Sequence, residues 1–86
     1  MNPDSLLHTL QARGHRLTTA RRLMLAALSE ANSPLAAVDL LKHLHARHRR
    51  ANKTTVYREL NFLSTQNIVR QIDFGDGTRR YELAGD

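Results

Sequence analysis

One segment of the chain sorts its side chains by polarity around a helix: Lys53-Thr54-Thr55-Val56-Tyr57-Arg58-Glu59-Leu60-Asn61-Phe62-Leu63. On a wheel at about 100° per residue, Val56, Leu60 and Leu63 fall within one narrow arc, which predicts the side that packs on a core. The opposite arc carries only hydrogen-bonding groups and one cation. Its members are Thr54, Arg58, Asn61 and Thr65, with Tyr57 and Ser64 on one flank and Glu59 expected at the side.

The polar arc has the chemistry of a surface that contacts DNA bases. Arginine can bridge two acceptors of guanine, asparagine can pair with adenine, and threonine or an aromatic ring can touch the thymine methyl group. Thr54 and Thr55 would lie at the helix N-terminus, where backbone N–H groups and the helix dipole favour a phosphate. The alternative is an ordinary amphipathic helix with a solvated polar side. Such a side more often mixes Glu with Lys, so the arc favours DNA.

Caps and breakers divide the rest of the chain into further elements. Residues 68–74 combine β-branched side chains with partial alternation, Gly75-Asp76-Gly77 is a turn signal, and residues 78–83 alternate again, which predicts a two-stranded hairpin. Four helices are expected before it: from Asp4 or Ser5 to Gly14, from the cap Thr18 to about Glu30, from about Ala36 to Arg47 after the breaker Asn32-Ser33-Pro34, and from Lys53 or Thr54 to about Gln66, ended by a left-handed Asn67.

This order of elements indicates a mainly α fold with a small β-hairpin. Three or four helices followed by a two-stranded hairpin, in a basic chain, predict a winged helix-turn-helix in which the hairpin is the wing. The chain has 86 residues, which is enough for one small core but not for two. We therefore expect residues 1–86 to form a single domain.

The charge balance is basic, with 13 Lys and Arg against 8 Asp and Glu and a net charge of +5. Such an excess favours a polyanionic partner, although it can also serve solubility. Contacts from these cations to phosphates would set affinity and register rather than sequence preference, and Arg16 is the best candidate to enter a minor groove. The cations form three groups: Arg13, Arg16, Arg21 and Arg22; Lys42, Arg47, Arg49, Arg50 and Lys53; and Arg79 and Arg80.

Several classes of function have no support in the residues. The chain has no cysteine, which excludes disulfides, thiolate zinc sites and cysteine nucleophiles. It has no recognisable acid–base pair, phosphate-binding loop or nucleophile motif, so we do not expect an enzyme. No apolar run approaches the ~20 residues of a membrane span, and Met1-Asn2-Pro3-Asp4 lacks the features of a signal peptide. The expected location is the cytoplasm, with no membrane partner.

The segment 53–63 also resembles the recognition-helix motif of the ferric uptake regulator (Fur) family, whose core is T-V-Y-R-x-L. Residues 16–21, Arg-Leu-Thr-Thr-Ala-Arg, resemble the family's segment that opens the second helix, with Ala20 where the family often has proline. Residues 68–83 resemble its wing. The resemblance implies the winged-helix DNA-binding domain of a metal-responsive transcriptional repressor, acting on double-stranded DNA at an AT-rich palindromic operator.

The family pattern also implies roles for individual residues. Tyr57 and Arg58 would contact bases or phosphates in the major groove, Thr55 would lie near the DNA backbone, Arg16 would enter the minor groove and Arg21 would contact the backbone. Together with the helix and wing arguments, the expected DNA-contacting residues are Arg16, Arg21, Thr54, Thr55, Tyr57, Arg58, Asn61, Arg79 and Arg80.

The family's regulatory metal site is expected to be incomplete in this chain. Glu82 matches one family ligand, but Ser33-Pro34-Leu35 lacks the histidine found before the third helix, and the His-rich linker and dimerisation domain are missing. One carboxylate cannot hold a transition metal, so we expect no cofactor here, and Zn²⁺ or Fe²⁺ only in a full-length member. His45 and His48 share a face in the expected helix and His43 does not; solvated histidines are favoured over a weak metal site. The simplest expectation is a fragment of a longer regulator, mainly monomeric where full-length members are dimeric.

Three other interpretations stay open. The chain could be a naturally short DNA-binding regulator that works without metal. It could be a winged helix that uses its basic face to dock an acidic protein, although a docking face should show a contiguous apolar patch. A small nucleic-acid-processing enzyme is disfavoured by the missing catalytic constellation.

Overall fold

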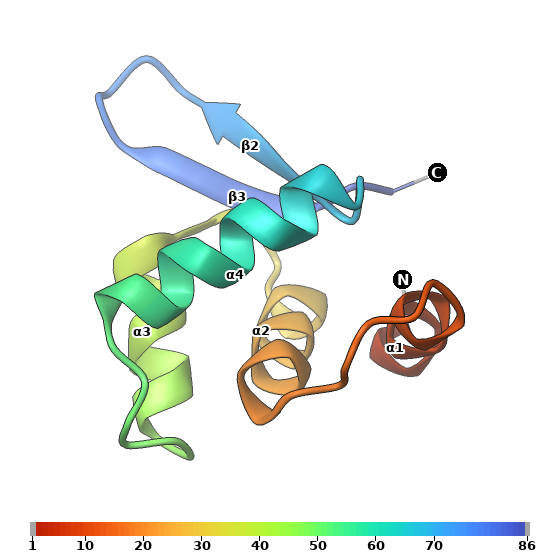
Figure 1. Cartoon of the computed structure of the whole chain (residues 1–86). Coiled ribbons are helices and arrows are strands. Elements are labelled where there is room, and N and C mark those ends of the chain that lie inside the picture. The colour runs from red at the N-terminus through yellow and green to blue at the C-terminus, as the bar shows by residue number, and fades with distance from the viewer. Residues whose placement is uncertain (1, 86) are drawn as a thin grey trace.

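The computed structural model describes residues 2–85; Met1 and Asp86, which the expected domain includes, lie outside the described residues. Four helices and three strands follow one another along the chain (Figure 1). None of the helices in the described part is long and apolar enough to cross a membrane. The elements are α1 (Pro3–Ala12), α2 (Thr19–Glu30), β1 (Leu35–Ala36), α3 (Ala37–His45), α4 (Lys53–Thr65), β2 (Val69–Asp73) and β3 (Arg79–Leu83).

Side chains cap the helices at their first turns, where backbone N–H groups lack partners. Thr18 caps α2 as predicted, since its hydroxyl accepts from Arg21 N at 3.2 Å. The predicted start of α1 at Asp4 or Ser5 is wrong, because Asn2 Oδ1 accepts from Asp4 N at 2.8 Å and so caps the helix earlier, with Pro3 in its first turn. The α3 helix ends at His45, two residues before the predicted end.

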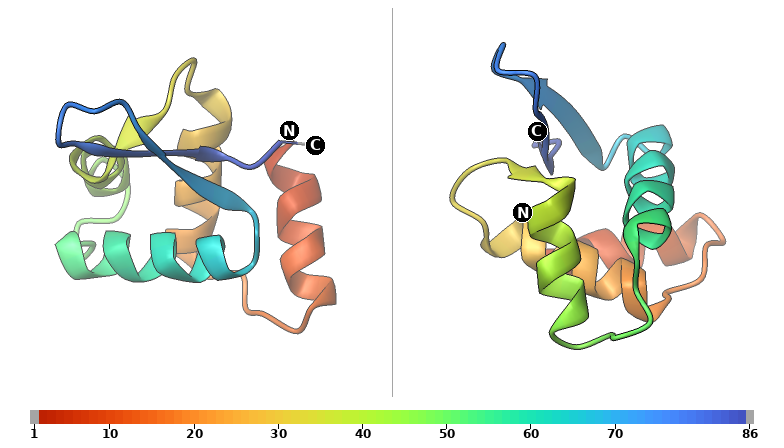
Figure 2. Two further views of the ribbon diagram at one scale, coloured as in Figure 1. Left: turned by 90° about the horizontal axis from the view of Figure 1, so that it is seen from above. Right: turned by 90° about the vertical axis from the view of Figure 1, so that its left-hand side faces the viewer.

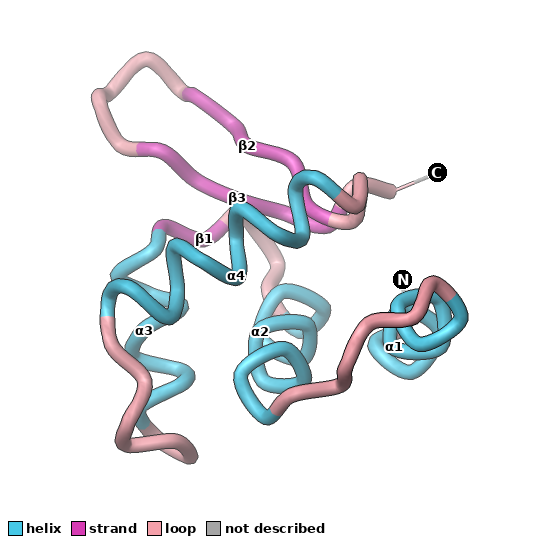
Figure 3. The backbone as a smooth tube through the Cα atoms, viewed as in Figure 1, coloured by secondary structure: helices cyan, strands magenta, loops and turns pink. Residues whose placement is uncertain are grey.

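The sheet has one more strand than the sequence predicted. The expected hairpin forms from β2 and β3, joined by the turn at Gly75-Asp76-Gly77, but β1 pairs antiparallel with the other edge of β3, in the order β1-β3-β2. Leu35 lies opposite Tyr81 in this register. Figure 3 shows β1 as a short segment between α2 and α3, beside β3. A strand of two residues has too little periodicity to be recognised in the sequence.

The core lies where α2, α3 and α4 meet beneath the sheet. In Figure 1, α4 lies across α2 and α3, and α1 packs on the far side of α2. The right-hand view of Figure 2 shows the hairpin rising away from the helices. Helices closed on one side by a projecting hairpin form a winged helix-turn-helix, as expected. The largest fully buried side chains are Leu10, Met24, Leu25, Leu40, Leu44, Val56, Leu60 and Leu63.

Candidate nucleic-acid interface

The α4 helix divides its side chains as the wheel predicted. Val56, Leu60 and Leu63 are at most 2% exposed and anchor the helix on the core. The opposite side, called here the outer face of α4, is exposed along the whole helix, and Tyr57 on its flank is half exposed. The outer face therefore offers hydroxyl, amide and guanidinium groups to solvent, from Thr54, Arg58, Asn61 and Thr65.

The start of α4 is fixed by a reciprocal cap. Asn52 Oδ1 accepts from Thr55 N at 3.0 Å, and Thr55 Oγ1 accepts from Asn52 N at 3.3 Å. This arrangement satisfies two of the N–H groups that a helix start leaves without partners. Thr55 is thus engaged in the cap and partly exposed, whereas Thr54 is exposed. The helix N-terminus keeps its favourable position for an anion.

The chain between α1 and α2 runs beside α4 in the opposite direction; residues 13–18 are called here the arm. Arg13 Nη1 donates to Gln66 O at 2.9 Å, at the C-terminal end of α4. The ring of His15 meets the ring of Phe62 edge-on at 4.9 Å between centroids. These contacts fix the arm along one flank of α4.

Arg21, at the start of α2, closes this flank. Its Nε donates to Glu59 Oε2 at 3.0 Å, its Nη1 donates to Arg16 O at 2.7 Å, and its guanidinium lies 3.8 Å from the ring centroid of Phe62. The side chains of Arg21 and Glu59 are only 16% and 11% exposed. The sequence suggested that Glu59 lies at the side of the helix. In the structure it is instead buried in an ion pair with Arg21.

The wing lies along the opposite flank of α4. Tyr57, Asn61, Gln71 and Arg79 line an open groove between the helix and the hairpin. Arg79 is exposed and shares a strand face with buried Tyr81, because alternate residues of a strand point to the same side. Gln71 also lines this groove, although it is not among the residues predicted from the sequence to contact DNA. Its pairing with Tyr81 across the hairpin is the signal that could have found it.

Arg80 has different surroundings from its neighbour Arg79. Its Nη1 donates to Asp76 Oδ2 at 2.8 Å, and its guanidinium lies 5.3 Å from the ring centroid of Phe74. Asp76 Oδ1 also accepts from Thr78 N at 3.1 Å. The Thr78 N–H and, after it, the Arg80 guanidinium stabilise the charged carboxylate, which lowers the pKa of Asp76 below its ordinary value.

The five arginines among the predicted site residues thus fall into two sets. Arg16, Arg58 and Arg79 are exposed, and within residues 2–85 their guanidinium groups have no hydrogen-bond or ion-pair partner. Arg16 and Arg79 lie on opposite flanks of the outer face that carries Arg58. Arg21 and Arg80 are engaged in ion pairs inside the protein. A further cation that the sequence grouped with them, Arg13, holds the end of α4 instead.

The loop that leads into α4 and the first residue of that helix carry a dense group of exposed cations: Arg47, Arg49, Arg50 and Lys53. His45 Nε2 bonds to Ala51 O and ties this loop to the end of α3. Because α3 ends at His45, His48 lies in the loop, and the predicted helical face shared by His45 and His48 does not form. Ala51, which lies among the polar residues of this loop, is buried and anchors the loop to the core.

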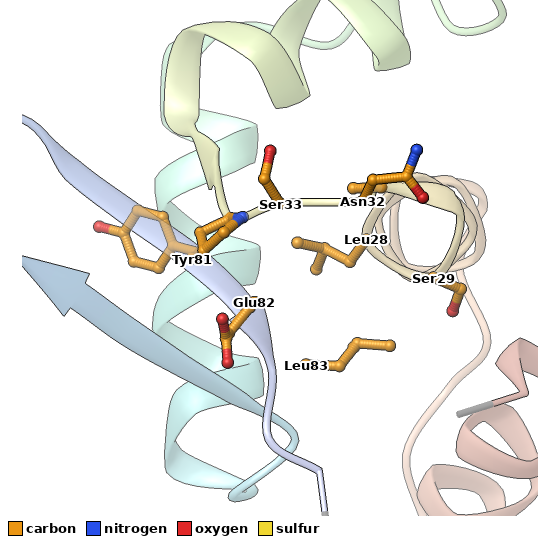
Figure 4. A pocket seen from close by; sticks show the side chains of 9 residues that line it. Leu28, Ser29, Asn32, Ser33, Tyr81, Glu82 and Leu83 are labelled. Atoms are coloured by element: carbon orange, nitrogen blue, oxygen red, sulfur yellow. The ribbon is translucent and has the colours of Figure 1, made fainter.

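The pocket at Ser33 and Glu82 does not fit a transition metal. Figure 4 shows Ser33, from the loop before β1, and Glu82, from β3, lining the same pocket together with Ser29 and Asn32. The Glu82 carboxylate is taken by Arg70, whose Nε and Nη2 donate to it at 2.8 and 2.5 Å. Within residues 2–85, no three His, Asp or Glu side chains gather where they could hold a metal ion. Hydroxyls, an amide and one paired carboxylate are a poor donor set for zinc or iron.

The fold and this surface define a winged-helix unit with a polar helix face between two exposed arginines, and comparison with known proteins places it in a family. The model of the ferric uptake regulator family matches residues 12–86, so the chain belongs to that family. It is 34% identical over 84 residues to the ferric uptake regulation protein of Synechocystis sp., covering 93% of this chain and 50% of that protein. It is 33% identical over 81 residues to the protein of the same name from Synechococcus elongatus, covering 92% and 55%.

A solved structure supports the fold. The Helicobacter pylori ferric uptake regulator, described as having three functional metal-binding sites, superposes with a TM-score of 0.86 at 21% identity, over 100% of this chain and 60% of that one. At this identity the likeness concerns the fold alone. The chain spans about half the length of the curated relatives it matches.

Proposed function

We propose that this chain is the DNA-binding part of a metal-responsive transcriptional regulator, a repressor that binds double-stranded DNA. Membership of the ferric uptake regulator family supports the class of function, which is regulatory rather than enzymatic. One observation of the structure carries the proposal: the outer face of α4 is exposed, carries no acid, and is flanked by the guanidinium groups of Arg16 and Arg79, which have no partner within residues 2–85.

In this proposal α4 enters the major groove of the duplex. Arg58 and Asn61 on the outer face, with Tyr57 on its flank, contact base edges, which is the readout that discriminates base pairs. Thr54 and the helix N-terminus meet a phosphate, with Thr55 close to the backbone. Arg16 enters the adjacent minor groove from one flank, and Arg79 holds a phosphate on the other. The cations of the loop before α4 add to the phosphate contacts.

Arg21 and Arg80 fit a direct role in DNA binding less well than the sequence suggested. Glu59 and the Arg16 carbonyl already use Nε and Nη1 of Arg21, and Asp76 uses Nη1 of Arg80. A phosphate therefore meets only part of each guanidinium unless Arg21 leaves Glu59 or Arg80 leaves Asp76. The first exchange would leave a carboxylate that is 11% exposed without its partner, which is costly. The Arg80 pair is more exposed and would open more easily.

We also propose that metal sensing and dimerisation belong to parts of the regulator outside these 86 residues. The pocket at Ser33 and Glu82 supports this, because its donors do not suit a transition metal. The 86-residue chain should then be mainly monomeric and bind a single half-site of an AT-rich palindrome. Without a link between two such units, an avidity factor of roughly 10²–10⁴ is lost.

A binding titration tests the proposal. The wild-type chain is titrated into an AT-rich palindromic duplex and into a scrambled duplex of the same composition, at several salt concentrations. We expect weak binding with preference for the palindrome, and an affinity that falls steeply as salt rises. Equal binding to both duplexes would reduce the chain to a nonspecific basic surface. Absence of binding to either, at low salt, would favour the alternative in which the basic face docks an acidic protein.

A further inference from the structure

We infer that Arg21 is a positioning residue, which fixes the arm beside α4 and thereby holds Arg16 where it meets DNA. The inference rests on the proposed function and gives Arg21 a part other than the phosphate contact that the family resemblance implied. It concerns a cluster made of Arg16, Arg21, Glu59 and Phe62, in which elements distant in sequence meet.

The guanidinium of Arg21 is used on three sides at once. Nε donates to the Glu59 carboxylate at 3.0 Å, Nη1 donates to the carbonyl of Arg16 at 2.7 Å, and the guanidinium carbon lies over the Phe62 ring, 3.8 Å from its centroid. A planar fork with donors in fixed directions suits this arrangement, whereas a lysine ammonium is a single point charge on a flexible stem. Two of the three contacts hold α4, and the third holds the backbone of the arm.

Burial keeps Arg21 inside the protein. Its side chain is 16% exposed and that of Glu59 is 11% exposed, so each neutralises the other in a poorly hydrated place. A phosphate that drew Arg21 away would leave the Glu59 carboxylate unpaired beside the DNA, where its negative charge repels the phosphates of the duplex. The ion pair therefore holds Arg21 in place against a phosphate, and the Glu59 carboxylate offsets its charge in the attraction of DNA.

The Arg16 carbonyl is the point at which this cluster bears on DNA binding. The arm is held at three places: Arg13 on Gln66 O, His15 on Phe62, and the Arg16 carbonyl on Arg21. The Arg16 side chain projects from this fixed backbone and is exposed. Because the backbone is already ordered beside α4, DNA binding does not have to order it, and the distance between the minor-groove and major-groove contacts is preset.

Variants of Glu59 and Arg21 separate the two roles. Glu59→Ala removes the partner of Arg21, and Glu30→Ala, an exposed acid at the end of α2, is the matched control for loss of one negative charge. If Arg21 positions the arm, Glu59→Ala binds the AT-rich duplex more weakly than Glu30→Ala, by roughly 3- to 30-fold. If Arg21 is a phosphate contact, Glu59→Ala releases it and binds more tightly. Arg21→Lys keeps the positive charge but lacks the planar fork. The positioning role therefore predicts a loss of affinity comparable to that of Glu59→Ala, and the phosphate-contact role does not.

A double-mutant cycle completes the test, with all titrations made at a temperature where circular dichroism shows each variant folded. Arg21→Lys should add less than about twofold to the loss caused by Arg16→Ala, because the two substitutions remove one contact. Its effect should multiply with that of Arg58→Ala, the matched control on the outer face. If the effect of Arg21→Lys multiplies with that of Arg16→Ala as well as with that of Arg58→Ala, Arg21 acts independently of Arg16 and the inference is overturned. If Arg21→Lys couples equally to both substitutions, it loosens the domain in general, and the inference is overturned as well. A wild type that prefers no duplex would instead remove the proposed function, and the inference with it.

Discussion

The Arg21 guanidinium lies 3.0 Å from the Glu59 carboxylate and joins the first turn of α2 to the middle of α4. The two residues are 38 positions apart in the sequence, and both side chains are mostly buried. Because water is largely excluded from this place, each charge is stabilised mainly by the other. The pair therefore fixes the position of α4 relative to α2. The outer face of α4 and the arm take their relative position from this contact.

The pair should be asymmetric toward mutation. Arg21→Met should lower the free energy of unfolding by about 2–3 kcal/mol, somewhat less than for a fully buried pair, because it leaves Glu59 without a partner in a poorly hydrated place. Adding Glu59→Leu should restore most of that stability, since the double variant replaces both charges with apolar groups. Urea denaturation of the two single variants and the double variant measures this. Additive losses in the double variant would show that the charges do not depend on each other.

The wing turn should respond to pH through Asp76. Its pKa lies below the ordinary value of 3.8, chiefly because the Thr78 N–H bonds to the carboxylate and further because Arg80 does. A lowered pKa in the folded state means that the carboxylate stabilises the turn fully above about pH 4 and loses this effect as the pH falls through the lowered value. A ¹³C-detected titration of the Asp76 carboxyl should give a midpoint below 3.8.

Arg80→Gln separates the two causes of that shift. The midpoint of Asp76 should rise only part of the way toward 3.8, because the Thr78 N–H, the larger cause, remains. A complete return to 3.8 would assign the whole effect to Arg80 and contradict the importance of the backbone hydrogen bond.

The elements that the sequence predicted are those specified by neighbouring residues. Thr18 caps α2, and Asn67 has the left-handed conformation expected of it, with φ of 60° after Gln66, the C-cap of α4. The apolar arc of α4 is buried as the period of the helix requires. In each case the information lies within a few positions of the residue concerned, where capping, turn chemistry and helical spacing act.

The contacts that the sequence did not predict join distant segments. Arg21 and Arg13 look like exposed cations in the sequence, yet one is paired with Glu59 and the other with the end of α4. The pairing of Arg70 with Glu82 depends on the register of the hairpin. The two residues of β1 form a strand because they pair with the free edge of β3. The partner of a charged side chain is decided by the tertiary packing, which helical and strand periodicities do not describe.

Divalent metals should leave this chain nearly unchanged. No three His, Asp or Glu side chains of residues 2–85 form a metal-binding group, and Glu82 is paired with Arg70. A structural metal would normally couple its binding to folding, so that a chelator unfolds the domain. Thermal melts with EDTA, with Zn²⁺ and with neither should overlay. A transition that moves by several degrees with chelator would show that the histidines or Glu82 hold a metal after all.

Arg58 and Arg79 should differ in how they affect binding to DNA. Arg58 lies on the outer face of α4, and Arg79 lies on the wing across the groove from Tyr57 and Asn61. If α4 enters the major groove, Arg58→Ala should cost roughly 1–3 kcal/mol with the AT-rich palindrome and blur the preference for it over the scrambled duplex. Tyr57→Phe, which removes one hydroxyl, should act in the same direction.

Arg79→Ala should weaken binding to both duplexes alike and lower the slope of log affinity against log salt by about one unit, as loss of one phosphate contact does. The measurement is a titration of each variant against both duplexes across a series of salt concentrations. Arg80→Ala is the matched control on the wing. Because the Arg80 guanidinium is paired with Asp76, its removal should change the salt slope less than the removal of Arg79. If Arg58→Ala weakens both duplexes equally and lowers the salt slope, Arg58 holds a phosphate, and the base contact must come from Asn61 or Tyr57 instead.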